Sequence, residues 1–169
     1  MDSSQLKSLQ APLKAQYRDD PDSAMIVLSA ESKLGEGVTC KVDTGKAIVE
    51  AGLHPATGGD GLSACSGDML LEALVACAGV TLGAVATALN IELRDATIRA
   101  EGELDFRGTL AVDKEAAVGF RKINMTFNLD CDASPEQRDS LIKLTERYCV
   151  VFQTLNSRPE LVVNVTSNT

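Results

Sequence analysis

The sequence contains no tryptophan, only six tyrosine and phenylalanine residues together, and a single histidine, His54. Aromatic side chains on which nucleic-acid bases could stack are therefore scarce. Acidic residues outnumber basic residues by 24 to 16, which gives a formal net charge of −8, and Lys and Arg form no cluster. Because phosphate backbones are bound by clustered Lys and Arg, we expect no nucleic-acid partner.

The sequence contains five cysteines, none of which form a C-x-x-C pair: Cys40, Cys65, Cys77, Cys131 and Cys149. With one histidine in the chain, this pattern offers no zinc site, and we expect neither a metal nor a cofactor. An odd number of cysteines in a chain of ordinary size fits a reducing compartment. The N-terminal stretch "MDSSQLKSLQAPLK" also lacks the basic start, apolar run and cleavage site of a signal peptide, which predicts a cytoplasmic location.

One apolar run, residues 69–89, is about long enough to span a bilayer and contains a G-x-x-x-G pattern. It also contains six alanines and Glu72, and its flanks are acidic rather than basic. These features favour a buried core helix, and we expect no membrane span.

The order of elements predicts an α+β fold. Residues 1–24 resemble a weakly helical arm that ends in the turn-rich "RDDPDS", and residues 25–169 form a single domain. Alternating patterns predict strands over 24–34, 38–42, 47–52, 91–106, 122–131 and 161–167, with a glycine-rich loop over 53–67. Helices are expected over 70–90 and from Ser134 onward, and strands and helices in separate runs are typical of α+β proteins.

Local signals mark both helix starts. Ser66 is a candidate N-cap for the first helix, and Asp68 in its first turn suits the helix dipole. In the second helix Ser134, Pro135 and Gln137 form a capping-box pattern. The second helix is expected to continue past residue 149 and to place four side chains on one face: Leu141, Leu144, Tyr148 and Phe152.

The first helix is apolar nearly all round. Its bulky stripe consists of Leu71, Val75, Ala78, Leu82, Val85 and Leu89. Two stripes of small residues lie beside it, the first of Ala76, Gly79, Gly83 and Ala86 and the second of Ala73, Cys77, Ala84 and Ala88. A helix of this kind must be covered on most sides, and a second copy of the same helix is the simplest cover, which predicts an extensive homodimer. The alternative is that the second helix of the same chain covers this surface.

From spacing alone Cys77 reads as a small core residue, because buried thiols have a raised pKa and are usually inert. Cys40, within a strand, and Cys131, at a strand end, are likewise expected to serve packing.

Two motifs together resemble the OsmC/Ohr family of thiol-dependent hydroperoxide reductases. "SGDMLLEALVACAGVTL" followed by "NIEL" is similar to the central helix of that family, and "ERYCVVFQTL" is similar to its second cysteine motif. The resemblance covers roughly residues 25–167 in element order. It implies antiparallel sheets that wrap long central helices in an intertwined homodimer.

The resemblance also implies roles for two sulfurs. Cys77 would be the peroxidatic thiolate, oxidised to a sulfenic acid, and Cys149 the resolving thiol that forms a disulfide with it. The implied substrate is a small organic hydroperoxide, and the implied reductant is a lipoyl-type dithiol. Cys65, in the glycine-rich loop, is an alternative resolving thiol.

The sequence departs from the family pattern at three positions. The acidic residue is best matched by Asp68, which lies nine residues before Cys77 and therefore on the opposite helix face, so it would act across the dimer interface or through an intermediary. Glu72 is the alternative acidic residue. The arginine that activates the thiolate in the peroxidases cannot be placed, because Arg18 precedes the first strand and Lys33 is not an arginine. Val150 stands where proline is usual.

Two functions follow from these observations. The first is a thiol peroxidase that reduces organic hydroperoxides through Cys77 and Cys149, with Asp68 as the acidic residue of the site. The alternative is a non-catalytic OsmC-like module that binds a small apolar ligand at the dimer interface, with both thiols as packing.

Overall fold

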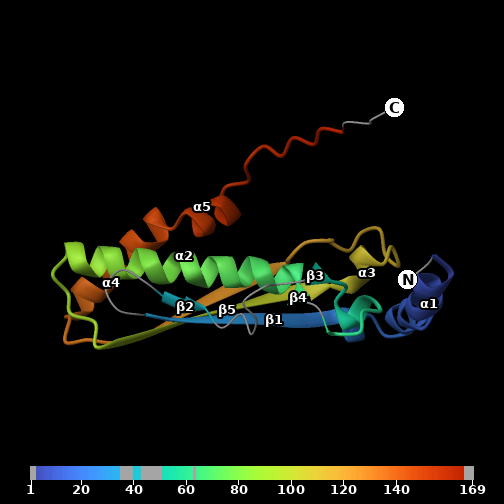
Figure 1. Ribbon diagram of the computed structural model, residues 1–169, viewed down its shortest axis with the longest axis horizontal. Coiled ribbons are helices and arrows are strands. Elements are labelled where there is room, and N and C mark those ends of the chain that lie inside the picture. Colours follow the sequence, from blue (N-terminus) through green and yellow to red (C-terminus); the bar gives the residue numbers. More distant parts are fainter. Residues whose placement is uncertain (1–2, 35–39, 43–50, 63, 166–169) are drawn as a thin grey trace.

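A four-stranded antiparallel sheet is the base of the fold (Figure 1). The computed structural model describes residues 3–34, 40–42, 51–62 and 64–165, and side chains within 8–26, 52–62 and 64–165. The strands β1 (Met25–Leu34), β2 (Cys40–Val42), β5 (Asp95–Asp105) and β6 (Lys122–Asp130) lie in the order β2-β1-β5-β6. The predicted α+β class is confirmed.

β5 forms the centre of the sheet because it pairs with β1 on one side and β6 on the other. Its side chains alternate along the strand, and Ala96, Ile98 and Ala100 are buried. This alternation places small and β-branched residues beneath the long helix. The strand is shorter than the expected 91–106, since residues 91–94 precede it without strand structure.

A short parallel pair interrupts the segment expected to be a loop. β3 (Ala51–Gly52) pairs with β4 (Ala64–Cys65), so the prediction of a plain connector over 53–67 is wrong at its end. The 3-10 turn η2 (Pro55–Thr57) lies between them and ends at Gly58, whose φ of 93° favours glycine. Of the strand predicted over 47–52, residues 47–50 lie outside the described residues.

The long helix α2 (Ser66–Ala88) begins four residues before its predicted start. Ser66 is its first residue, and the N-cap is Cys65 with an extended backbone at ψ 133°. The prediction of Ser66 as the cap is therefore wrong. Pairing of Cys65 with Gly52 in the parallel strands fixes this extended backbone one residue earlier than expected.

The bulky stripe of α2 faces the core as predicted, and its buried members are Leu71, Val75, Ala78, Leu82 and Val85. The first small-residue stripe is already buried within a single chain at three of its positions, Gly79, Gly83 and Ala86. These positions therefore need no second copy to cover them. α2 contacts β1 and β5, and small residues allow that close approach. An exposed row remains on α2: Met69, Ala73, Val80, Ala84 and Thr87.

The second helical segment divides into two helices at Cys149. α4 (Pro135–Tyr148) begins with the predicted capping box, in which Ser134 accepts from the backbone N–H of Gln137. α5 (Val150–Asn156) follows Cys149, whose ψ of 107° is extended. The expected continuous face is wrong at its end: Tyr148, the last residue of α4, is 58% exposed, and Phe152 lies in α5 beyond the break.

Both helices contact α2, and α5 lies above it in Figure 1 while the sheet lies below. One side of α2 is therefore covered by helices of the same chain. This is the alternative that the sequence offered to cover by a second copy. α2 is long and apolar enough to cross a membrane by length and composition alone, and half of its most apolar window is buried inside the protein.

The N-terminal residues form a docked helix. α1 (Ser3–Asp19) is followed by η1 (Pro21–Ala24), and both lie near the short helix α3 (Phe106–Thr109) at one end of the molecule (Figure 1). Tyr17 is buried and donates a 2.7 Å hydrogen bond from its hydroxyl to the carbonyl oxygen of Ala56 in η2. The expected arm is thus held by the domain.

The chain after α5 leaves the body of the molecule (Figure 1). The predicted closing strand over 161–167 is wrong for its described residues 161–165, which have no strand structure and pair with none of the described strands. The four apolar side chains there are between 69% and 89% exposed: Leu161, Val162, Val163 and Val165. Residues 166 and 167 of that prediction lie outside the described residues.

We expect the buried ion pair at the end of β5 to stabilise the fold. Arg107 Nη2 lies 2.6 Å from Asp105 Oδ2, and the Asp105 side chain is 2% exposed. Asp105→Asn should lower the free energy of unfolding in urea at pH 7 by about 2 kcal/mol, because Arg107 loses a charged partner. Arg107 lowers the pKa of Asp105, so this contribution is present above the unfolded value and fades as the pH falls below about 3.9.

Asp113→Asn is the matched control. Asp113 lies 3.6 Å from Arg107 Nη1 and is 39% exposed, so its loss should change stability far less. Equal destabilisation by the two variants would contradict this account of Asp105.

Candidate functional site

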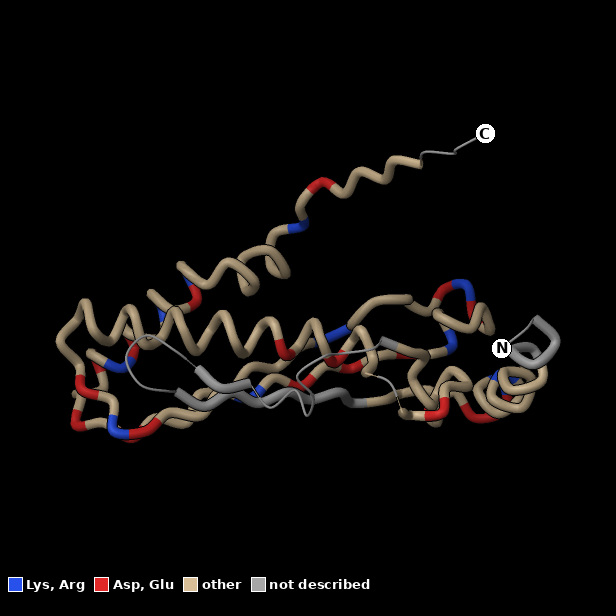
Figure 2. Tube along the Cα trace, viewed as in Figure 1, with Lys and Arg blue, Asp and Glu red and all other residues tan. Residues whose placement is uncertain are grey.

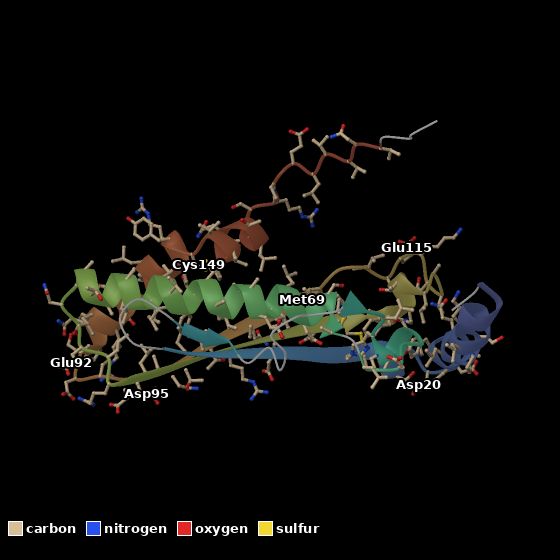
Figure 3. The ribbon with its side chains drawn as sticks, viewed as in Figure 1. Asp20, Met69, Glu92, Asp95, Glu115 and Cys149 are labelled. Atoms are coloured by element: carbon tan, nitrogen blue, oxygen red, sulfur yellow. The ribbon has the colours of Figure 1, made fainter. Side chains whose placement is uncertain are left out.

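Cys77 and Cys149 meet where α4 and α5 cross α2. Cys77 lies in the middle of α2 and is half-buried, while Cys149 lies between α4 and α5 and is fully buried. Each thiol is among the groups that shift the pKa of the other, so the two side chains are neighbours. The structure therefore brings together the two cysteines that are 72 residues apart in sequence (149 − 77), and Figure 3 shows Cys149 beside α2.

The helix break at Cys149 supplies donors to both sulfurs. The first N–H groups of a helix have no partners within it. At the start of α5, the N–H groups of Val150 and Val151 bond to the sulfur of Cys77. The Phe152 N–H donates to Cys149 Sγ at 3.5 Å. The Gln153 N–H bonds to the Cys149 carbonyl at 2.9 Å, so all four N–H groups of this turn have partners.

The pKa of Cys77 is lowered. Burial alone would raise it, but hydrogen bonds outweigh burial, and they come from the Val151 N–H, the Cys149 thiol, the Thr81 hydroxyl and the Val150 N–H. Thr81 stands four residues after Cys77 on α2, so the two side chains share a helix face. A lowered thiol pKa increases the thiolate fraction, which is the nucleophilic form.

The pKa of Cys149 moves in the opposite direction. Burial raises it most, the Phe152 N–H lowers it, and the neighbouring Cys77 raises it further, to about 11. Cys149 therefore stays protonated near neutral pH and donates its proton toward Cys77. The pair is asymmetric: one sulfur tends to the thiolate and the other remains a thiol.

Asp68 does not reach Cys77 of the same chain. The two residues are nine apart on α2, which separates them by about 13 Å along the axis. Burial raises the pKa of Asp68 and the charge of His54 lowers it, with a net rise. The His54 ring stacks on Phe106 at 4.9 Å. Glu72, the alternative acidic residue, points about 140° away from Cys77.

Cys65 is remote from Cys77 within one chain. It precedes α2, and twelve residues of helix place it about 18 Å away along the axis. The alternative that Cys65 resolves Cys77 of the same chain is therefore excluded by this geometry. Cys131 is buried at the end of β6, as expected for a packing residue. Cys40 lies in β2, as expected, but its side chain is outside the described residues.

The groups that shift the pKa of Cys77 include no lysine or arginine, within the part of the chain that the structure describes. Arg18 lies in the last turn of α1, at the far end of the molecule (Figure 1). The side chain of Lys33 lies outside the described residues. Sequence reasoning missed Thr81 and the N–H groups of α5 as partners of Cys77. The four-residue spacing from Cys77 could have indicated Thr81.

An apolar cavity of about 630 Å³ lies between α2, α4, α5 and β6, and neither thiol is among its lining residues. Leu70 and Leu74 line it from the same side of α2 as Cys77, and Phe152 lines it from α5. The sheet contributes Ile123, Met125 and Phe127 to the lining. Phe120, which also lines the cavity, packs on Gly102, where a Cβ atom would lie only 2.3 Å from the Phe120 ring. Cys77 lies one turn beyond Leu74, and a cavity of this size can hold a small apolar molecule. Arg121, Lys122 and Glu146 supply charges at its wall.

The OsmC family model, described as OsmC-like protein, matches residues 58–164. An OsmC-like hydroperoxide resistance protein from Jannaschia sp. CCS1 aligns with a TM-score of 0.62 and 17% identity, over 85% of this chain and 95% of that chain. An OsmC-like protein from Mycoplasma pneumoniae aligns with a TM-score of 0.56 and 16% identity, over 79% and 86%. A search of curated proteins gave no match.

The two structural alignments establish a shared fold, and the family model spans more than half of the sequence. They confirm the resemblance carried by the two cysteine motifs. The chain belongs to the OsmC-like protein family.

Proposed function

We propose that the protein is a thiol peroxidase that reduces organic hydroperoxides through Cys77, with Cys149 as the resolving thiol. The observation that carries the proposal is the meeting of two thiols that act on each other's pKa, so that the pKa of Cys77 is lowered and that of Cys149 is raised. A hydroperoxide resistance protein among the similar solved structures supports the same chemistry.

In the first step the Cys77 thiolate attacks the terminal oxygen of the hydroperoxide, and the O–O bond breaks. The alkoxide leaves and takes a proton to become an alcohol, while Cys77 becomes a sulfenic acid. In the second step Cys149 attacks the sulfenic sulfur, and the S–S bond forms as hydroxide leaves. The hydroxide combines with the Cys149 proton to release water.

A lipoyl-type dithiol closes the cycle by exchange. It reduces the 77–149 disulfide to two thiols and becomes a disulfide itself, which requires no further cofactor or metal. A reducing cytoplasm supplies such dithiols, and this is the compartment that we propose. The apolar lining of the cavity favours alkyl over inorganic peroxides, because alkyl surface gains free energy on leaving water.

A homodimer is part of the proposal. The exposed row on α2 has helical spacing, includes Val80 at 42% exposure, and contains no charged residue. Figure 2 shows α2 tan over most of its length, with red only near its start. β6 is an edge strand of the described sheet, and the apolar tail 161–165 pairs with none of the described strands. Pairing of the tail with β6 of a second copy would give both a partner.

In such a dimer Asp68 acts on Cys77 of the other copy. Within one chain the two are about 13 Å apart along α2, so a catalytic role of Asp68 depends on the second copy. Its raised pKa would leave it able to exchange a proton at a higher pH than an ordinary carboxyl group.

The alternative function, a non-catalytic module, is favoured only by the cavity. A space of about 630 Å³ lined by leucine, isoleucine and phenylalanine side chains can hold an apolar ligand without any chemistry. In that case both thiols serve packing, and oxidation would be slow and spread over all five cysteines.

One equivalent of cumene hydroperoxide, followed by disulfide mapping with mass spectrometry, separates the two functions. We expect a single 77–149 disulfide within seconds, because the two thiols are near enough to shift each other's pKa. Cys77→Ser should abolish peroxide consumption. Cys149→Ser should allow one turnover and then accumulate sulfinic acid at Cys77.

Cys131→Ser is the matched control, since Cys131 is buried but lies at the end of β6. It should consume peroxide at the rate of the wild type. Undiminished consumption by Cys77→Ser, or slow oxidation of all five cysteines, would refute the peroxidase proposal.

The dimer is tested by light scattering of the wild type and of Val80→Glu. We expect the wild type to have twice the chain mass of 17.9 kDa, and Val80→Glu to dissociate because it places a charge in an apolar interface. Ser140→Glu adds the same charge on an exposed face of α4 and should remain a dimer. A monomeric wild type at micromolar concentration would contradict the proposed assembly.

A further inference from the structure

Gly102 lies within the central strand β5, at a position where glycine weakens a strand. Its backbone conformation does not require glycine, because positive φ angles among the described glycines occur only at Gly58 and Gly61. The position requires the absence of a side chain instead: an added Cβ would lie 2.3, 2.5 and 3.2 Å from three atoms of the Phe120 ring. Phe120 therefore occupies the space that a side chain at position 102 would fill.

The alternation of β5 places the Phe120 ring on the inner face of the sheet. Gly102 shares its face with the buried residues Ile98 and Ala100, and this face lies beneath α2. Gly102 also pairs with Ile123 of β6, which lines the cavity. The Phe120 ring is thus held at the end of the cavity where β6 begins, and it is itself part of the lining.

The cavity extends along β6, where Ile123, Met125 and Phe127 form its floor. The four residue steps from the first to the last of these correspond to about 13 Å of strand. Gly119, the residue before Phe120, also lines the cavity, and an added Cβ there would meet no atom within 4 Å. The space beyond the ring is therefore open, and the ring rather than the chain beside it limits the cavity at this end.

We propose that Phe120, held in place by Gly102, is a specificity-determining residue that sets the length of the apolar ligand that the cavity accepts. A molecule that fits between Phe127 and Phe120 buries its apolar surface, whereas a longer linear chain meets the ring and keeps part of its surface in water. For the selection of hydroperoxides by the size of their organic group, the inference rests on the proposed function. Selection of ligands by length requires no reaction at either thiol.

The test is displacement of the fluorescent probe N-phenyl-1-naphthylamine from the reduced full-length protein by 1-octanol and by 1-tetradecanol. We expect the wild type to gain little affinity from the longer chain, because the additional carbons do not enter the cavity. Phe120→Ala should bind 1-tetradecanol about tenfold more tightly than the wild type, since burial of about two further methylene groups suffices for that change. Its affinity for 1-octanol should change far less, and Phe120→Leu should lie between the two proteins.

Val118→Ala is the matched control. Val118 belongs to the same loop, but its side chain is 64% exposed and does not line the cavity. This variant should bind both alcohols as the wild type does. An unchanged length preference in Phe120→Ala, an equal change in Val118→Ala, or a wild type that binds neither the probe nor the alcohols would overturn the assignment of Phe120.

Gly102→Ala tests the contact that holds the ring. In the wild type the new Cβ displaces the Phe120 ring, and we expect a lower urea midpoint of unfolding. In Phe120→Ala the space is vacant, so the same substitution should leave the midpoint unchanged or raise it, because alanine is less costly than glycine within a strand. An equal loss in both backgrounds would show that the ring does not depend on Gly102, which contradicts the proposal.

Consumption of cumene hydroperoxide by the same variants keeps the two proposals separate. A protein that selects alcohols by length through Phe120 but consumes no hydroperoxide supports the role of Phe120 and refutes the peroxidase. An active peroxidase whose length preference is unchanged in Phe120→Ala refutes only the role of Phe120.

Discussion

The extended backbone of Cys149 is the constraint on which the site depends. It ends α4, begins α5 one residue later, and thereby frees the N–H groups of a new helical turn directly over α2. Two of these groups bond to Cys77 and one to Cys149 itself. A continuous helix would have bonded them to its own carbonyls, and Cys77 would then be a desolvated thiol with a raised pKa.

The pKa values of the two thiols shift in opposite directions because their surroundings differ. Cys149 is fully buried, so burial outweighs the backbone N–H groups of Phe152 and Val151, and its pKa rises to about 11. Cys77 is only half-buried and accepts several hydrogen bonds, so its pKa falls. The asymmetry separates a nucleophile from a proton-bearing partner without any charged side chain among the described residues that act on Cys77. The apolar cavity near Leu74 adds a place for an alkyl group one helical turn away.

The sequence predicted those features that depend on local chemistry or on periodicity. The capping box at Ser134, the buried stripe of α2 and the strands β1, β5 and β6 all follow from spacing that a single segment contains. Features set by distant segments could not be predicted in this way. Pairing with Gly52 moved the N-cap of α2 to Cys65, and packing within the chain buried Gly79 and Gly83. The resemblance named both cysteines, but only the folded chain identified Thr81 and the N–H groups of α5 as their partners.

The most direct test of this account is a pH titration of the reduced wild type by NMR, with ¹³C at the β-carbon of cysteine. This signal reports ionisation even for a buried thiol that reagents cannot reach. The account predicts that Cys77 ionises first, below the ordinary value for a thiol, and that Cys149 ionises at a pH of about 11. A common midpoint for the two thiols, or ionisation of Cys149 before Cys77, would contradict it.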